Sequence, residues 1–207
     1  WMKISRNKLF KLLNIDILKS FEIINIKKNN INVNLEILNF DLKMSQNRIV
    51  PIAILKNSSF KNLQPIMIYQ AGSTTGYHIS WGEYHSKIEK KRINLHGSDI
   101  AKQAANKGWV IICIEQFGFG KRSEKKRIKY IKNILIEDYF SSGILLGRSP
   151  LGERVQDVYN CISWIKENYK KLEILNNTNI NNINIMGHSS GGTVAMYAAA
   201  IDERIKL

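Results

Sequence analysis

The pattern of apolar and polar positions predicts strands in the first third of the chain and strands alternating with helices after it. Apolar and polar residues alternate over 21–39, the period of a half-buried strand, around a polar break at 27–30, so we predict a hairpin there. Two more strands are expected at 48–55 and 65–69, and turn-forming residues at 57–62 separate them.

The second half of the chain alternates between apolar runs and helical spacing. A mostly apolar run at 110–115 predicts a strand that is covered on both faces. A helix over 99–107, with Ser98 as its N-cap, precedes this strand, and a longer helix is expected over 149–169. Strand, helix and strand in this order predict an α/β fold, with a doubly wound, mostly parallel sheet flanked by helices.

Two segments lie outside this regular pattern. Residues 1–20 place apolar side chains at helical spacing among lysines, which predicts a short amphipathic helix packed on the edge of the domain. The same pattern suits a helix that binds a partner or a membrane surface. The span 121–147 has a basic first half followed by apolar patches, and we interpret it as an insertion near the mouth of the site, of the kind that forms a lid.

The segment 183–196 carries the most specific chemical motif in the chain. A short apolar run stops at Gly187, presents Ser189 and continues after Gly191 into small, helix-forming residues. The spacing Gly-x-Ser-x-Gly between a strand and a helix is that of a nucleophile elbow, a strained turn that exposes a serine hydroxyl above a sheet. We therefore predict Ser189 as a catalytic nucleophile, and the two glycines as positions where a Cβ would clash with neighbouring chain.

A second loop of small and polar residues, 70–76, directly follows the strand expected at 65–69. Where a nucleophile elbow is present, this early loop supplies one backbone donor of the oxyanion hole, and the residue after the nucleophile supplies the other. We predict the backbone amides of Ser73 and Ser190 in these roles. The alternative is an ordinary loop that is rich in glycine and hydroxyl groups.

Other candidate sites are less specific. The residues His78, Glu83, His85 and His96 fit no metal-ligand spacing, so we predict no metal and no cofactor. The glycines at 118–120 lack the third glycine of a dinucleotide fingerprint and the residues of a phosphate-binding loop, and we interpret them as a tight turn.

Charged and sulfur-containing residues inside the expected helices and strands are interpreted as structural. Glu153, Arg154 and Asp157 lie on the helix over 149–169, where charges usually form surface or network ion pairs. Cys113 and Cys161 form no disulfide-rich or metal-binding pattern, so we predict that both are small core residues.

Composition bounds the class of protein without identifying it. The 207 residues, 44% of them hydrophobic, suit one domain with a sizeable core. No apolar run approaches the roughly 18 to 20 residues of a membrane span. The formal net charge is +14, but lysine is spread along the chain, and the basic stretches 87–92 and 121–132 nearly lack aromatic residues for base stacking. We predict a solvated basic surface and no nucleic-acid partner.

Together these residues resemble the α/β-hydrolase superfamily, and within it the acetyl-xylan-esterase-like and dienelactone-hydrolase-like serine hydrolases. The resemblance depends on 187–192, is supported by 118–122, 146–157 and 197–205, and covers most of the chain after about Arg48. It implies a carboxylic ester hydrolase that cleaves a small-molecule ester through an acyl-enzyme on the elbow serine.

One departure from the superfamily pattern concerns the rest of the triad. The usual chain order is serine, then an acid, then histidine. Here only residues 190–207 follow the elbow serine, no histidine is among them, and Asp202 and Glu203 lie too early. We expect residues 1–207 to be a single domain that is truncated before the triad acid and base and is inactive alone. Because the first residue is Trp1, a leader is undetermined, and the compartment is unknown, with the cytoplasm favoured.

Two other functions remain open at this point. A peptidase of the prolyl-oligopeptidase type also carries Gly-x-Ser-x-Gly-Gly, although such enzymes usually add a large gating domain, of which nothing is visible here. A non-catalytic binding protein on a hydrolase scaffold is the second, because fold does not fix function.

Overall fold

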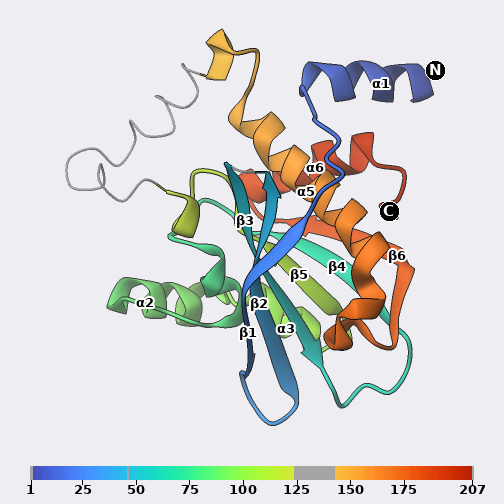
Figure 1. Cartoon of the computed structure of the whole chain (residues 1–207). Coiled ribbons are helices and arrows are strands. Elements are labelled where there is room, and N and C mark those ends of the chain that lie inside the picture. Colours follow the sequence, from blue (N-terminus) through green and yellow to red (C-terminus); the bar gives the residue numbers. More distant parts are fainter. Residues whose placement is uncertain (1, 46, 124–142, 207) are drawn as a thin grey trace.

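A computed structural model describes residues 2–45, 47–123 and 143–206 of the chain. Its strands form a mixed sheet in the order β1-β2-β3-β5-β4-β6 (Figure 1). The strands are β1 (Glu22–Asn30), β2 (Leu35–Ser45), β3 (Arg48–Asn57), β4 (Gln64–Gln70), β5 (Val110–Ile114) and β6 (Thr178–Gly187). The α-helices are α1 (Met2–Leu12), α2 (Lys87–His96), α3 (Ile100–Ala105), α5 (Pro150–Asn168) and α6 (Ser190–Ile201). No α-helix of the described residues is both long and apolar enough to pass through a bilayer.

The sheet has an antiparallel part and a parallel part. Three pairings are antiparallel, β1 with β2, β2 with β3 and β3 with β5, whereas β4 lies parallel to both β5 and β6. The predicted α/β fold with flanking helices is confirmed. Because β4, β5 and β6 run in the same direction, the loops that follow them meet at one edge of the sheet, which is where ligands bind in such folds.

Helices cover both faces of the central strands, and β5 shows this most clearly. All five of its residues are buried. Val110, Ile112 and Ile114 belong to the core under α5 and α6, while Ile111 and Cys113 belong to the core that α3 shares with the 3-10 helix Tyr77–Trp81. The two cores confirm the prediction of a strand covered on both faces, and both cysteines are buried with free thiols, as predicted.

The first hairpin turns later than predicted. The polar stretch 27–30 continues β1, which lies at the edge of the sheet with its side chains largely exposed. The turn falls at 31–34, where Asn32 Oδ1 accepts hydrogen bonds from the backbone amides of Asn34 and Leu35. Such an Asx-type turn reverses the chain without glycine or proline.

Three element boundaries also differ from the predictions. The helix expected over 1–20 ends at Leu12. α3 is shorter than predicted, and its N-cap is Asp99 rather than Ser98, whose hydroxyl instead donates to the carbonyl oxygen of Arg92 at 3.5 Å. β6 begins at Thr178, ahead of the apolar run that stops at Gly187, and its first residues pair with the beginning of β4. Most of the interpreted insertion at 121–147 lies outside the described residues.

The segment between α1 and β1 lies against α5. The Asp16 backbone donates to Gln156 Oε1 at 2.9 Å and accepts from Asn160 Nδ2 at 2.9 Å. Gln156 and Asn160 are 2% and 0% exposed, so these bonds satisfy polar groups inside the fold. At Gly152 a Cβ would lie only 2.3 Å from the carbonyl oxygen of Leu13, so the segment approaches the helix backbone directly.

An ion-pair network joins α5 to β3 and to the turn after β5. The Asp157 side chain, 1% exposed, binds the guanidinium groups of Arg48 and Arg122. Glu153 binds both Arg48 and Arg148. The interpretation of these helix charges as structural is confirmed. Burial acts to raise the pKa of the Glu153 carboxyl, but the hydrogen bond from Arg148 and the ion pair with Arg48 hold this pKa below its ordinary value.

We expect Asp157→Asn to lower the free energy of unfolding of the complete protein by at least about 3 kcal/mol, because it removes the carboxylate partner of the buried Arg122 and one of the two carboxylate partners of Arg48. The matched control is Glu203→Gln, since that carboxylate is 71% exposed and pairs with Arg6 at the surface. The control should change stability by less than about 1 kcal/mol. Urea unfolding measures both values, and equal effects of the two substitutions would show that burial of the network is unimportant.

Candidate active site

Ser189 lies between the end of β6 and the start of α6 and has a strained backbone conformation. Its φ and ψ angles are 53° and −122°, and its side chain caps no helix amide. The other non-glycine residues with positive φ in the described chain are asparagines, which tolerate this region better. A conformation of this kind disfavours folding by about 1 to 3 kcal/mol and persists where surrounding structure imposes it. The Ser189 residue is also exposed.

Close backbone packing imposes the turn. A Cβ on Gly187 would lie 2.1 Å from the carbonyl oxygen of Gly191. A Cβ on Gly191 would lie 2.1 Å and 2.4 Å from the carbonyl oxygens of Gln70 and Ala71. No side chain fits at such distances, so α6 begins directly against the end of β4 only because these two residues are glycines.

The loop after β4 lies beside this turn, so the structure brings together the residues predicted for the site. The amide of His188 donates to the carbonyl oxygen of Gln70 at 3.1 Å. The hydroxyl of Ser73 donates to the hydroxyl of Ser190 at 3.2 Å. A Cβ on Gly72 would lie 3.3 Å from the Cβ of Ser189.

The backbone amides of Ser73 and Ser190, predicted as oxyanion donors, have no hydrogen-bond acceptor among the residues that the structure describes. The Ser190 amide is in the first turn of α6, where backbone N–H groups lack intrahelical partners and the helix dipole favours negative charge. The Ser73 amide belongs to the exposed part of the neighbouring loop. Both amides are therefore available to an anionic oxygen near Ser189.

A general base for Ser189 is not found among the described side chains. None of their histidines, aspartates or glutamates forms a hydrogen bond with its hydroxyl. His188 adjoins it in sequence, but the imidazole lies against Gly72, where a Cβ would be 2.8 Å from His188 Nδ1. This part of the chain therefore offers a serine and amide donors without a proton acceptor.

Two buried residues after β5, which the sequence analysis did not single out, hold the loop after β4 in place. The Gln116 side-chain amide donates to the carbonyl oxygen of Ala71. The Glu115 carboxylate, 2% exposed, accepts from the Tyr77 amide at 3.1 Å and 3.3 Å. The sequence feature that could have identified them is a pair of polar residues directly after an apolar strand.

Burial raises the pKa of Glu115 from its ordinary value of 4.5 to about 7, although the Tyr77 amide and the nearby Lys121 and Arg122 act in the opposite direction. The folded state therefore binds more protons than the unfolded state between these two values. As a consequence, the contribution of this group to stability is present below about pH 4.5 and is lost as the pH rises through about 7, a change of up to about 3 kcal/mol.

We expect Glu115→Gln to remove this pH dependence, because the amide is neutral and its oxygen can still accept from Tyr77. Urea unfolding of the complete protein at pH 5 and pH 8 should show a smaller loss of stability for the variant than for the wild type. Glu167→Gln, at an exposed position on α5, serves as the control and should retain the wild-type difference. Parallel pH profiles for wild type and Glu115→Gln would contradict the assignment.

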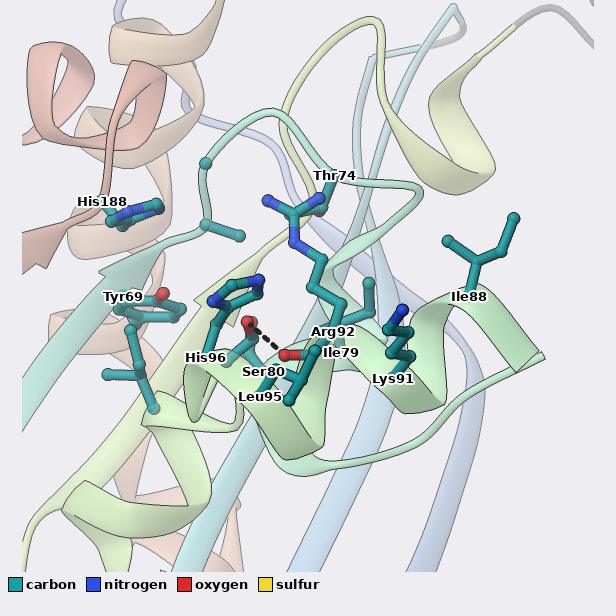
Figure 2. A pocket seen from close by; sticks show the side chains of 14 residues that line it. Tyr69, Thr74, Ile79, Ser80, Ile88, Lys91, Arg92, Leu95, His96 and His188 are labelled. Carbon is teal, nitrogen blue, oxygen red and sulfur yellow. Dashed lines mark hydrogen bonds between the residues drawn. The ribbon is translucent and has the colours of Figure 1, made fainter. Parts of the chain in front are cut away.

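A cavity of about 650 Å³ opens between α2 and the end of β4, and we call it the α2 cavity. His188 and Gly72, which flank the strained serine, form part of its wall, and Tyr69 lies at its base (Figure 2). From α2 it receives Lys91 and Arg92 among other residues. The cavity therefore adjoins the turn that presents Ser189.

The histidines considered as metal ligands lie in two places. The rings of His78 and His85 stack at 4.3 Å between centroids, and His78 Nε2 lies 3.5 Å from Glu89 Oε1. Glu83 accepts from the Trp81 indole, whereas His96 lines the α2 cavity. Over the described ranges, no group of three or more histidine, cysteine, aspartate or glutamate side chains has the geometry to hold a metal ion.

Helix α2 was not predicted, and residues 87–92 in it were interpreted only as a basic stretch. The signal that could have found it is the capping-box spacing of Ser86 and Glu89. The Ser86 hydroxyl accepts from the Glu89 amide at 3.2 Å, and Glu89 accepts from the His85 amide at 2.5 Å. Gly97, with φ of 56°, ends the helix in the left-handed conformation.

The sheet, its flanking helices and the turn at its edge define the class of the protein as an α/β hydrolase fold. Residues 93–206, just over half of the chain, match the family model described as alpha/beta hydrolase fold. The chain belongs to this family. Its predicted superfamily and its acetyl-xylan-esterase-like fold are confirmed.

Solved structures with this fold include several esterases. A Bacteroides fragilis protein assigned as an acetyl xylan esterase has a TM-score of 0.81 and 16% identity, over 99% of this chain and 51% of the other. The acetyl xylan esterase from Paenibacillus sp. R4 has a TM-score of 0.58 and 17% identity, over 98% and 56%. The glucuronoyl esterase from Solibacter usitatus has a TM-score of 0.58 and 9% identity, over 97% and 55%. The chain thus spans about half the length of these proteins, and it matches no curated protein in sequence.

Proposed function

We propose that the chain carries the nucleophile and oxyanion hole of a serine hydrolase that cleaves a small-molecule carboxylic ester. The observation that carries this proposal is the exposed, strained Ser189 between β6 and α6, beside two amides without acceptors. Gly187 and Gly191 are its elbow glycines. The esterases among the similar folds support an ester rather than an amide substrate, which favours this function over a peptidase.

In the proposed reaction, the Ser189 hydroxyl oxygen attacks the ester carbonyl carbon as a base removes its proton. The amides of Ser73 and Ser190 donate to the oxygen that becomes negative in the tetrahedral intermediate. Expulsion of the alcohol, which takes up the proton, leaves an acyl-enzyme. Water then attacks the acyl carbon and releases the acid and the free serine.

We also propose that the base and its orienting carboxylate follow Leu207, in a single hydrolase domain with residues 1–207. Two observations support this. The described residues offer Ser189 no base, and the similar structures are about twice as long as the aligned chain. The triad order of serine, acid and histidine agrees with this placement. The 207-residue chain alone should then lack turnover.

A fluorophosphonate probe tests the proposal on the complete protein, because such probes label only an activated serine. We expect one probe per chain, located on Ser189 by peptide mapping, and none in Ser189→Ala. A 4-nitrophenyl ester and an aminoacyl 4-nitroanilide, assayed side by side, distinguish an esterase from a peptidase. Absence of labelling would instead favour a binding protein on a hydrolase scaffold.

A further inference from the structure

The α2 cavity has a basic wall. Lys91, Arg92 and His96 line it from one side of α2, and no carboxylate is among its lining residues. Figure 2 shows the Arg92 side chain extending from the helix toward Thr74, on the loop after β4. The cavity therefore places positive charge close to the wall that it shares with the strained serine turn.

Arg92 differs from the other described arginines in having no partner for its guanidinium. Those that pair with carboxylates are Arg6, Arg48, Arg122, Arg148 and Arg204. Arg154 donates to the carbonyl oxygen of Phe117 and lies over the Phe119 ring. Arg92 is partly buried, yet within the described residues its guanidinium makes no hydrogen bond and no ion pair. A fork of donors without a protein partner thus lines the cavity, which suits bidentate binding of a carboxylate.

Tyr69 gives an independent indication of a ligand in the same cavity. The residue is 4% exposed, and its hydroxyl has no hydrogen-bond partner in the part of the chain that the structure describes. Because Tyr69 lines the cavity and its hydroxyl is not among the enclosed polar atoms without a partner, the hydroxyl is open to a molecule in the cavity. Burial raises the pKa of Tyr69 to about 12, so the phenol stays protonated and can donate to an anionic oxygen.

We propose that the α2 cavity binds a carboxylate of the ester substrate, with Arg92 as its main partner, so that the enzyme prefers esters of acidic compounds. This inference rests on the proposed function. Gly72 links the two sites, because it lines the cavity and its Cβ position is 3.3 Å from Ser189 Cβ. Apolar side chains complete the cavity and suit the hydrocarbon part of such a substrate: Ile79, Ile88, Leu95 and Ile100.

Paired substrates test the proposal on the complete protein. On the acyl side, mono-4-nitrophenyl glutarate is compared with 4-nitrophenyl pentanoate, and on the alcohol side, 4-acetoxybenzoate is compared with phenyl acetate. For at least one pair we expect the carboxylate ester to have the higher kcat/KM. Arg92→Gln should lower that value about tenfold to a hundredfold, mainly through KM, because hydrogen bonds to charged groups are worth about 1.5 to 3 kcal/mol.

Two variants make the test specific. Lys87→Gln removes one positive charge from the exposed start of α2 without touching the cavity, and should leave both substrates of each pair within about twofold of wild type. Arg92→Lys retains the charge and should recover part of the lost preference. Equal losses on charged and neutral esters in Arg92→Gln, or no preference in the wild type, would overturn the proposal.

Glutarate binding, measured by isothermal titration calorimetry, separates this inference from the proposed function. If the protein hydrolyses no ester but binds glutarate, and loses binding in Arg92→Gln, the carboxylate site stands while the esterase proposal fails. If esters are hydrolysed but glutarate binds neither protein, and Arg92→Gln spares the carboxylate esters, the cavity proposal fails alone. If neither hydrolysis nor binding occurs, both fail.

Discussion

Replacing Ser189 by alanine is expected to lower ester hydrolysis by the complete protein at least about 10⁴-fold in kcat. Alanine removes the attacking oxygen and leaves the two amide donors in place, so the residual rate reports the oxyanion hole and substrate binding alone. Because alanine has the same Cβ as serine, the backbone strain at φ 53° stays nearly unchanged. The free energy of unfolding should therefore differ from wild type by less than about 0.5 kcal/mol.

Thr193→Ala is the matched control for this experiment. Thr193 lies in the first turn of the same helix, is exposed, and its hydroxyl has no bond among the described residues. Its removal should change kcat less than about twofold. Initial rates with 4-nitrophenyl esters give both numbers. Ester hydrolysis that survives in Ser189→Ala would mean that another group is the nucleophile.

The second large effect is expected for Gly191→Ala, which should destabilise the complete protein by about 3 kcal/mol or more and abolish probe labelling at Ser189. The added methyl group would lie 2.1 Å and 2.4 Å from two carbonyl oxygens at the end of β4. Backbone cannot rotate away as a flexible side chain can, so β4 and α6 must separate. Separation displaces the Ser190 amide from the loop that carries Ser73.

Gly192→Ala provides the comparison one residue further along α6. There the new Cβ would lie 3.4 Å from the Gly187 carbonyl oxygen, an ordinary contact. Alanine is the better helix former by up to about 1 kcal/mol, so stability should stay the same or rise. Thermal unfolding and probe labelling measure both variants. Similar losses in the two variants would show that the helix start tolerates no side chain at all, and that close approach to β4 is not the cause.

Much of the fold could be predicted because local pattern and burial agree. The apolar run that forms β5 is buried on both faces, and α5 begins at Pro150 after its N-cap Ser149, whose hydroxyl accepts from the Gly152 amide. By contrast, the order that places β5 between β3 and β4 results from long-range pairing, which no local pattern encodes. The late hairpin turn was missed because edge-strand residues such as those at 27–30 need not be apolar.

For the candidate site, the sequence was informative where backbone geometry demands particular residues. Gly187 and Gly191 mark the turn because no other residue fits, and this also singles out Ser189. The α2 cavity could not be predicted, because α2 has an irregular pattern in which Ile88 is 81% and Leu95 64% exposed. Its basic residues resembled a solvated surface, and only the fold shows that the Arg92 guanidinium, unlike those of the other described arginines, has no partner in the protein.

The contacts of Asp16 and Leu13 with α5 have a practical consequence for making the protein. A truncated protein that starts at β1 would lack the Asp16 backbone groups that bind Gln156 and Asn160. The side-chain amides of these two buried residues would then lose those hydrogen-bond partners. Residues 13–18 are therefore part of the packed structure around α5 and are needed for its stability. Purification tags and trimming sites therefore belong ahead of α1.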